Sequence, residues 1–280
     1  MSSRVRVECA ALSHQGLVRS RNEDHYLVVR LAREQQTLLT NLPEGDVPDR
    51  FEEHGYGMIV ADGMGGMASG QLASRVAIST LAHLALHYGK WNLRIDERTA
   101  SEVMERAERF YRMVDEAVTE RGQSEPALAG MGATLTGAFS AGDELFIAHV
   151  GHSRAYLFRD GRLIQLTHDQ TLAQRLSDTG RAAPSRLDGG HLRRILTDAI
   201  GGIAGTPTVD VRSVHLLDAD CVLLCTDGLT EMIDDGRIAS LLAERRAVDE
   251  QCRLLLDHAL ERGGSDNVTV VLARYDIPGT

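Results

Sequence analysis

The strand-forming segments of this chain are apolar on both faces, and this feature restricts the fold more than any other. Three segments, "ELFIAHV" from Glu144, "CVLLC" from Cys221 and "VTVVLA" from Val268, carry apolar side chains at odd and even positions alike. Because successive side chains of a strand point to opposite sides of a sheet, both sides must be covered. Each sheet therefore needs a packing layer above it and another below it.

The order of the elements selects between two architectures that cover both faces. A parallel sheet requires strands that alternate with helices, whereas strands here follow one another directly, and "RDGR" from Arg159 predicts a tight hairpin. Long helical patterns at 67–88 and 96–121 can cover an outer face. We therefore predict an α+β fold of two antiparallel sheets stacked face to face and flanked by helices. Residues 1–280 would form a single domain, with a charged, proline-containing insertion loop at about 34–55.

Composition and charge exclude several functional classes. The formal net charge of the 280 residues is -10 and no basic run occurs, which argues against binding to nucleic acid or to a membrane surface. The N-terminus lacks the apolar stretch of a signal peptide, and the most apolar helical segment, "VAISTLAHLAL" from Val76, is too short to span a bilayer. The four cysteines lack zinc-site spacing and are expected to be reduced core residues. A cytoplasmic protein is the expectation.

Acidic residues at the edges of apolar strands are the second informative pattern. They occur at four places: Glu23 and Asp24 in "RSRNEDHY", Asp62 in "VADGMGG", Asp227 in "LCTDGLT" and Asp266 in "GGSDNVTV". A single Asp-Gly is usually a turn, and "DGL" or "SDN" can begin a turn or cap a helix. The order and spacing of all four places together are much harder to explain as turns.

Carboxylates gathered at strand ends would repel one another, and a divalent cation removes that repulsion. Oxygen ligands select the hard metals magnesium, manganese or calcium. Gly63, directly after Asp62, would let a backbone carbonyl approach such an ion. Two ions about 3.5–4 Å apart would bridge a water molecule and turn it into a nucleophile for in-line attack at phosphorus.

Eight motifs in a fixed order carry a family resemblance. They are "SHQGLVRSRNED", "VADGMGG", "GATLTGAF", "VGHSRAYLFRDG", "LTHDQT", "ILTDAIG", "LLCTDGLTEMI" and "GGSDNVTVVL". With these motifs the chain resembles, from about Ala10 to Arg274, the bacterial metal-dependent protein phosphatases of the 2C type, the serine/threonine phosphatases of the PPM family. The resemblance implies a four-layer αββα sandwich and a flap beside the active site at about 169–205.

The same resemblance implies the activity and the metal ligands. The family hydrolyses phosphoserine and phosphothreonine in proteins without a covalent enzyme intermediate, using Mn²⁺ or Mg²⁺, two per active site. The expected partners are phosphorylated proteins, either serine/threonine kinases or their substrates, and the expected state is a monomer. Residues that match the family's metal positions are Asp62, which would bridge both ions, the Gly63 carbonyl, Asp227, Asp266 and Asp24, with Glu23 acting through water.

Arg19 matches the family arginine that grips the substrate phosphate, so Arg19 and Asp62 are the expected catalytic residues. A guanidinium fork suits a phosphate group physically, because it presents several N–H donors in one plane. Arg21 is expected to be an ordinary surface residue.

The chain departs from the family pattern at His152. Family members read Gly-Asp-Ser-Arg where this chain has "GHSR", and that aspartate helps to bind a third metal together with the residue equivalent to Asp227. Imidazole offers nitrogen in place of carboxylate oxygen. The expected third site, formed by His152 and Asp227, is weak, absent or biased toward manganese. Met64 stands where some members have a histidine, which leaves the general acid unassigned.

Two alternatives stay open at the level of sequence. The chain could be a catalytically impaired phosphoprotein-binding or scaffold module of the same fold, with His152 as a first sign of lost turnover. Intact Asp62, Asp227 and Asp266 argue against that alternative. A metal-dependent phosphohydrolase that acts on small molecules is the other, and the motifs do not separate it from a protein phosphatase.

Overall fold

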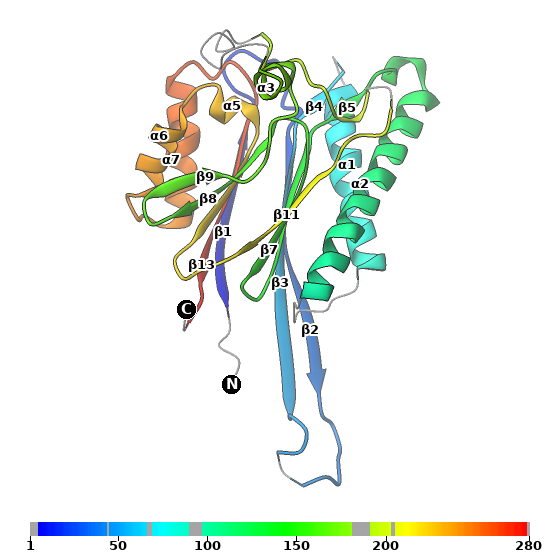
Figure 1. Ribbon diagram of the computed structural model, residues 1–280, viewed down its shortest axis with the longest axis vertical. Helices are drawn as coiled ribbons and strands as arrows, with labels where there is room; N and C mark the ends of the chain where they lie inside the picture. The colour runs from blue at the N-terminus through cyan, green and yellow to red at the C-terminus, as the bar shows by residue number, and fades with distance from the viewer. Residues whose placement is uncertain are drawn as a thin grey trace.

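The structure, a computed structural model, describes residues 5–43, 45–65, 69–89, 97–180, 191–202 and 205–278. Within them, two five-stranded antiparallel sheets stack face to face, and helices cover the outer face of each sheet (Figure 1). The predicted α+β class and the four-layer αββα arrangement are therefore confirmed.

The first sheet contains the predicted Asp-Gly hairpin. Asp160 and Gly161, between β8 (Arg154–Arg159) and β9 (Arg162–Gln165), have φ angles of 50° and 75°, the left-handed region that a two-residue hairpin turn requires. In spatial order the strands of this sheet are β1 (Arg6–His14), β13 (Val268–Asp276), β12 (Cys221–Cys225), β8 (Arg154–Arg159) and β9 (Arg162–Gln165).

The second sheet faces the first and has a small three-stranded sheet at its end. In spatial order its strands are β11 (Asp210–His215), β7 (Glu144–Val150), β6 (Leu135–Ala141), β3 (Arg50–Ala61) and β2 (His25–Gln36). The small sheet consists of β10 (Ile200–Gly201), β5 (Gly132–Ala133) and β4 (Gly63–Met64).

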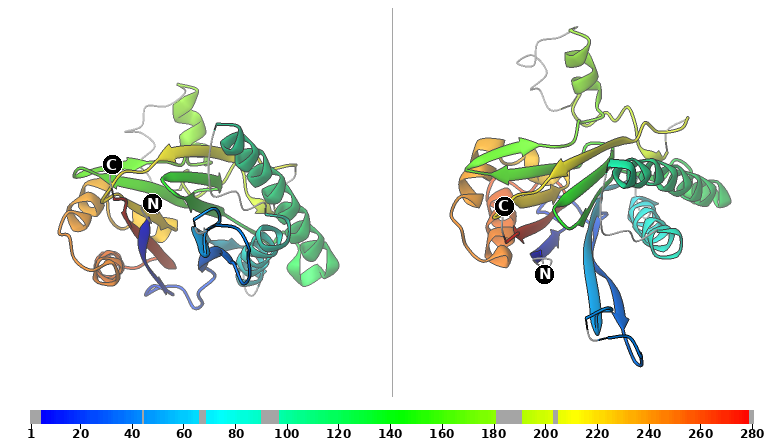
Figure 2. Two further views of the ribbon diagram at one scale, coloured as in Figure 1. Left: turned by 90° about the horizontal axis from the view of Figure 1, so that it is seen from below. Right: turned by 60° about the horizontal axis from the view of Figure 1, so that its bottom comes forward.

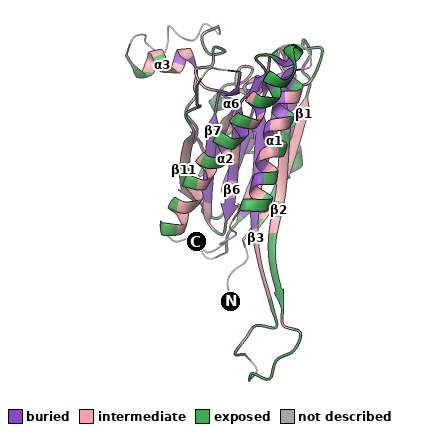
Figure 3. Ribbon diagram, turned by 90° about the vertical axis from the view of Figure 1, so that its right-hand side faces the viewer, coloured by how far each residue is buried: buried purple, intermediate pink, exposed green. Residues whose placement is uncertain are grey.

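Helices form the two outer layers. The long helices α1 (Ser69–Tyr88) and α2 (Glu97–Ser124) cover the second sheet, with their buried residues toward it and their exposed residues toward solvent (Figure 3). The first sheet is covered by α6 (Asp235–Leu242) and α7 (Val248–Glu261), while the four-residue α5 (Asp227–Thr230) follows β12. None of the described helices is long and apolar enough to cross a membrane.

The strand β12 shows why its sequence is apolar throughout. Cys221, Leu223 and Cys225 pack against the layer of α6 and α7, whereas Val222 and Leu224 pack between the two sheets. Alternate side chains of one strand therefore enter two different cores, as the pleat of a sheet requires.

The described cysteines are free thiols, but the expectation that all four lie in the core is wrong in one case. Cys221, Cys225 and Cys252 are buried, and burial raises the pKa of the Cys225 and Cys252 thiols to about 12. Cys9 is exposed because it lies on β1, an edge strand of the first sheet.

The predicted insertion loop at about 34–55 is wrong at both of its ends. Residues up to Gln36 and from Arg50 onward continue β2 and β3 as a paired ribbon, in register from His25 opposite Ala61 to Gln36 opposite Arg50. β6 accompanies β3 only from Gly55, so the outer part of the ribbon protrudes beyond the sandwich (Figure 1). That part carries charged and polar residues because no core lies against either face, which explains why its sequence does not alternate like a half-buried strand.

The polar stretch at about 169–205 is described except for residues 181–190 and 203–204. It contains the short helix α3 (Leu172–Asp178), which stands off from the sheets (Figure 2). Backbone hydrogen bonds join the start of α3 to a later part of the same stretch, since the Leu172 N–H donates to the carbonyl of Ile195 at 2.8 Å and the Thr197 N–H to that of Gln170 at 2.9 Å.

Candidate active site

Antiparallel pairing brings the predicted acidic residues to one end of the sandwich. Asp24 precedes β2 and Asp62 follows β3, and these two strands pair with His25 opposite Ala61. In the first sheet, Asp227 follows β12 and Asp266 precedes β13, and Cys225 pairs with Val270. The side chains of Asp24, Asp62, Asp227 and Asp266 lie close enough to affect one another's ionisation, and we call these four residues the acidic cluster.

Asp24 is the most enclosed member of the acidic cluster. Its side chain is buried, and its Oδ2 atom accepts hydrogen bonds from the hydroxyls of Thr226 and Thr269, each at 2.8 Å. Its Oδ1 atom is buried and has no hydrogen-bond partner. Burial, opposed by the two threonine hydroxyls and reinforced by Asp227 and Asp266, raises the pKa of the Asp24 carboxyl to about 7.

The Asp62 backbone is held firmly beneath its carboxylate. The Asp62 N–H donates to Thr134 Oγ1 at 3.0 Å, and the Thr134 N–H donates to the Asp62 carbonyl at 2.9 Å. Thr134 Oγ1 is in turn 2.7 Å from Ser153 Oγ. Burial first, and then the charges of the other three cluster members, raise the pKa of the Asp62 carboxyl well above its ordinary value.

Asp227 lies opposite the unusual histidine. His152 Nε2 is 3.5 Å from Asp227 Oδ2, and donor atoms of Asp62, His152 and Asp227 all lie within 4.8 Å of one another. Asp227 Oδ1 and His152 Nδ1 are both buried without a hydrogen-bond partner. Burial raises the pKa of the Asp227 carboxyl, and His152 partly opposes this shift.

Asp266 is joined to the predicted phosphate-binding arginine. Arg19 Nη2 lies 2.5 Å from Asp266 Oδ2, and the Asn267 N–H donates to Asp266 Oδ1 at 2.8 Å. The Arg19 side chain is about half exposed, at 53%, so its guanidinium lies between the acidic cluster and solvent. Arg21 is exposed, as predicted.

Glu23 lies beside the acidic cluster, over the start of α1. Its backbone is held from two sides: its N–H donates to Asn267 Oδ1 at 2.8 Å, and Ser74 Oγ donates to its carbonyl at 2.5 Å. A Cβ atom on Gly70 would lie 2.8 Å from Glu23 Oε2, so the glycine leaves room for the carboxylate. Burial raises the pKa of Glu23, while Arg19 lowers it.

The glycine after each central aspartate has a packing reason. A Cβ atom on Gly63 would lie 2.0 Å from the Gly70 carbonyl oxygen, and one on Gly228 would lie 2.0 Å from the Asn267 carbonyl oxygen. Any side chain there would push two backbone segments apart beneath the carboxylates. Coordination of a metal by the Gly63 carbonyl stays a prediction.

Several supporting residues were not identified from the sequence. Asn267 ties the Glu23 segment to β13, and its side-chain amide also donates to the carbonyls of Gln15 and Arg21 at 2.8 Å. Thr226 and Thr269 hold Asp24 across more than two hundred residues of sequence. In the sequence, Thr226 and Thr269 stand out only by lying close to Asp227 and Asp266. Asp24, to which they donate, lies far away in the chain.

A second arginine near the acidic cluster was also missed. Arg194, in the segment after α3, makes a paired salt bridge with Glu231, which follows α5, and its Nε lies 2.8 Å from Glu231 Oε1. Glu231 raises the pKa of the Arg194 guanidinium, and the charges of Asp227 and Asp266 act in the same direction. The sequence carried no motif for this pair.

The acidic cluster fits divalent metal ions. Two buried carboxylate oxygens, on Asp24 and Asp227, lack a hydrogen-bond donor, although a buried charge without a partner is costly. The donor set is carboxylate oxygen with one nearby imidazole, which suits magnesium or manganese. The fold and this donor set together define an α+β sandwich protein with a candidate divalent-metal centre at its strand ends.

Comparison with known proteins identifies the family. The family model "Protein phosphatase 2C" matches residues 40–263, and the chain belongs to this family. Serine/threonine protein phosphatase PstP of Mycobacterium tuberculosis is 35% identical over 265 residues, which are 94% of this chain and 44% of that protein. Serine/threonine phosphatase stp of Listeria monocytogenes is 34% identical over 220 residues, 79% of this chain and 84% of that protein.

A solved structure extends the comparison to the whole fold. The catalytic domain of PstP in complex with two manganese ions has a TM-score of 0.74 and is 32% identical, covering 97% of this chain and 99% of that one. Our chain thus spans less than half the length of full PstP but corresponds to nearly all of its catalytic domain.

Proposed function

We propose that this chain is a metal-dependent serine/threonine protein phosphatase that hydrolyses phosphoserine and phosphothreonine in proteins. The observation that carries the proposal is the acidic cluster, in which buried oxygens of Asp24 and Asp227 have no hydrogen-bond partner and suit coordination of a divalent cation. Membership of the protein phosphatase 2C family and the names of the relatives support the same activity.

Two Mn²⁺ or Mg²⁺ ions per active site would be held by the acidic cluster and its backbone. The ligands would be Asp62 between both ions, the Gly63 carbonyl, Asp24, Asp227 and Asp266, with Glu23 acting through water. When bound, such ions supply Lewis-acid activation of the phosphoryl group and of a water molecule. The residues themselves form a rigid frame, because Thr134 fixes the Asp62 backbone and Thr226 and Thr269 fix the Asp24 carboxylate.

Arg19 would orient the substrate phosphate. Its guanidinium is held at the edge of the acidic cluster by Asp266 and faces solvent, where a phosphorylated side chain would arrive. A guanidinium can keep one N–H on a carboxylate while it offers others to phosphate oxygens.

His152 and Asp227 would form an altered third metal position. His152 Nε2 lies 3.5 Å from Asp227 Oδ2, and ligand atoms of both residues lie within 4.8 Å of one on Asp62, which supports a shared ion at this position. Imidazole nitrogen favours manganese over magnesium. We expect His152→Asp to strengthen an additional, weaker binding event in calorimetric Mn²⁺ and Mg²⁺ titrations. Identical titrations of the wild type and the variant would contradict a role for this position.

The biological setting follows from the activity and is part of the proposal. Phosphorylated proteins, either serine/threonine kinases or the substrates of such kinases, would be the partners, in a cytoplasmic signalling role. The chain would act as a monomer. The stretch at about 169–205 would be the flap beside the active site, and the attachment of α3 to the segment around Ile195 supports treating it as one unit.

The decisive experiment is hydrolysis of a phosphothreonine peptide with Mn²⁺, with Mg²⁺ and with a chelator. The wild type should turn over only with a divalent ion, and Asp62→Asn should lose that turnover. Asp143→Asn is the matched control, because Asp143 belongs to a separate group with Glu144 and His215 outside the acidic cluster. Loss of turnover in both variants would point to a general effect of removing a carboxylate.

The alternative of a catalytically impaired phosphoprotein-binding module has its own outcome. A folded protein that binds the phosphopeptide but does not hydrolyse it with any divalent ion would favour that alternative. Faster hydrolysis of nucleotides than of phosphopeptides would instead favour a small-molecule phosphohydrolase.

A further inference from the structure

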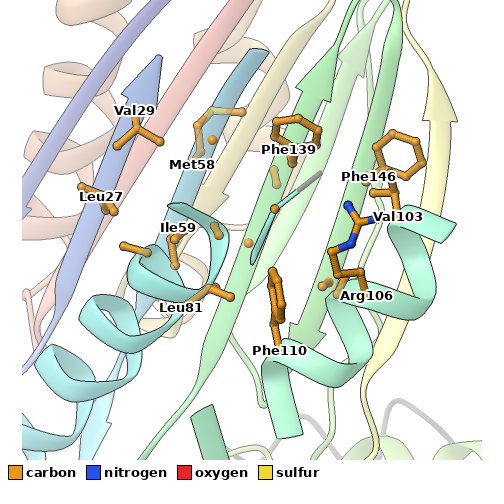
Figure 4. Close-up of a pocket in the computed structure, with 18 of the residues that line it drawn as sticks. Leu27, Val29, Met58, Ile59, Leu81, Val103, Arg106, Phe110, Phe139 and Phe146 are labelled. Carbon is orange, nitrogen blue, oxygen red and sulfur yellow. The ribbon is translucent and has the colours of Figure 1, made fainter. Parts of the chain in front are cut away.

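Apolar surface outside the packed cores is found in the described part of the chain both inside a cavity and on exposed side chains. The cavity, of about 410 Å³, lies between the second sheet and the helices α1 and α2, and its described lining includes no member of the acidic cluster (Figure 4). The exposed side chains include Leu17 and Val18, which are 65% and 70% exposed. Because these two residues directly precede Arg19, they adjoin the residue that would bind the substrate phosphate.

The two apolar residues lie on a loop, residues 15–21, which we call the Arg19 loop. The side-chain amide of Asn267 donates to the carbonyls of Gln15 and Arg21, both at 2.8 Å, and so joins the two ends of the loop. Within the loop, the side-chain amide of Gln15 donates to the Arg19 carbonyl at 2.6 Å. The middle of the Arg19 loop therefore projects from a fixed base.

The Arg19 loop is also attached to the segment that carries Asp266. The Leu17 N–H donates to the Gly264 carbonyl at 2.7 Å. Gly16 has a φ angle of 80°, and a Cβ atom there would lie 2.2 Å from the Asp266 carbonyl oxygen, so the loop lies directly against the Asp266 backbone. Arg19 in turn contacts the Asp266 carboxylate at 2.5 Å. These contacts fix the Arg19 loop relative to the acidic cluster.

The apolar character of Leu17 and Val18 has little packing role within the chain. Most of the surface of both side chains faces solvent, so their burial in the fold contributes little to its stability. A single exposed leucine is common on protein surfaces and needs no explanation. Here two apolar side chains lie next to each other, on a fixed loop, beside a guanidinium that faces solvent. What such a surface can gain is contact with an apolar group of a bound molecule.

A protein substrate whose phosphate reaches Arg19 must pass close to this surface. Consecutive Cα atoms of a chain are about 3.8 Å apart, so the residues directly before and after a phosphothreonine lie near it. On the side of this protein, Leu17 and Val18 lie within two residues of Arg19 and have the same short reach. Because the Arg19 loop is already held in place, covering it with a substrate side chain costs little conformational freedom. Burial of apolar surface there should therefore give a net gain.

We propose that Leu17 and Val18 form a specificity-determining surface, which favours substrates with an apolar side chain next to the phosphorylated residue. This proposal rests on the proposed function, because it takes Arg19 as the residue that binds the phosphate of a phosphorylated protein. It adds the class of sequence that such a protein carries at the site of hydrolysis: a phosphothreonine or phosphoserine with apolar neighbours in place of polar or charged ones.

Hydrolysis of two phosphothreonine peptides in the presence of Mn²⁺ tests the proposal. The peptides differ only at the residues directly before and after the phosphothreonine, which are leucine in one peptide and serine in the other. We expect the wild type to hydrolyse the leucine peptide with a kcat/KM about tenfold higher than that of the serine peptide. The difference should appear mainly in KM, because the apolar contact stabilises the bound substrate and the transition state alike.

Substitutions in the Arg19 loop assign the preference to its apolar residues. Leu17→Ser and Val18→Ser should each reduce the preference, and the double variant should retain about a twofold preference or less. The serine peptide should be hydrolysed with wild-type kcat/KM by every variant, because both side chains are mostly exposed and the acidic cluster is unchanged. Leu39→Ser is the matched control. Leu39 is 95% exposed and lies between β2 and β3, at the end of the ribbon away from the acidic cluster, so this variant should keep the full preference.

Three results would overturn the proposal while leaving the phosphatase activity in place. They are equal kcat/KM of the wild type for the two peptides, a preference that persists in the folded double variant, and an equal fall for both peptides in the variants, which would mean that the two residues only position Arg19. A wild type that hydrolyses neither peptide with any divalent ion would instead contradict the proposed function, and this inference with it.

Discussion

Two buried aspartates at opposite ends of β12 have opposite surroundings. Asp220, directly before the strand, is 1% exposed, and its oxygens accept hydrogen bonds from Arg159 Nε and Nη2 at 2.8 and 2.6 Å and from the Leu217 N–H at 2.8 Å. Asp24, beyond the other end, is 4% exposed, has two threonine hydroxyls on one oxygen and has no partner on the other.

On the proposed function, this difference separates a structural carboxylate, Asp220, from a metal-binding one, Asp24. Asp220 is neutralised within the protein, so the chain needs nothing further at that end of the sandwich. Asp24 lies among Asp62, Asp227 and Asp266, and within the described residues no group donates a hydrogen bond to Asp24 Oδ1 or Asp227 Oδ1. Burial of a carboxylate alone therefore does not indicate a metal site. A buried carboxylate oxygen without a hydrogen-bond donor is the additional sign.

The largest expected effect comes from a substitution in the acidic cluster, which should reduce activity without reducing stability. Asp227→Asn should lower kcat/KM by about a thousandfold, because a metal ligand contributes several kcal/mol to charge stabilisation in the transition state. In chelator, the melting temperature should stay the same or rise, since the substitution removes a repelling charge. A marked fall in the melting temperature would place Asp227 with Asp220 as a structural residue.

Substitution of Asp220, at the other end of β12, should reduce stability without reducing activity. Asp220→Ala should lower the free energy of unfolding by about 3 kcal/mol, because it leaves Arg159 and the Leu217 N–H without their acceptor. kcat/KM should stay unchanged below the melting temperature. Denaturant unfolding and phosphopeptide kinetics on the same preparation measure both quantities, and an activity loss comparable to that of Asp227→Asn would break the distinction.

The buried residue His149 should make the stability of the protein depend on pH. His149 is fully buried with Nδ1 2.8 Å from Thr136 Oγ1, its Nε2 has no partner, and burial lowers its pKa to about 4. Between pH 6.5 and 4 the unfolded histidine binds a proton that the folded one refuses, so stability should fall as the pH drops, by about 2 kcal/mol from pH 7 to 5.

His149→Gln should remove that part of the pH dependence. Denaturant unfolding at pH 7 and pH 5 measures it, with His215→Gln as a control, because His215 is an exposed histidine on β11. Equal slopes for the wild type and His149→Gln would mean that groups other than His149 set the acid response.

The sequence was most informative where one strand or one turn carried the whole signal. The two-faced apolar pattern of β12 and β13 predicted the stacked sheets, and "RDGR" predicted the β8–β9 turn, because pleat and turn geometry depend on adjacent residues alone. The acidic residues were recognisable for the same reason, since each one lies within two residues of a strand end.

Contacts between segments far apart in the chain could not be predicted from the sequence. The pairing of Asp24 with Thr226 and Thr269, the approach of His152 to Asp227 and the Arg194–Glu231 salt bridge each join segments that only the folded sheets bring together. The sequence predicts a loop where the ribbon of β2 and β3 protrudes, because the polarity of these residues reflects the lack of a neighbouring layer, which no local pattern reveals.

The sequence by itself determined which residues could form sheets and that acidic residues would lie at one end of them. The tertiary structure alone decided which of those acids have a buried oxygen without a hydrogen-bond donor, and that a cavity of about 410 Å³ with a mostly apolar lining lies beneath α1 and α2. The physical reason is that periodicity acts over neighbouring residues, whereas desolvation, hydrogen-bond satisfaction and packing volume depend on every segment that meets at a point.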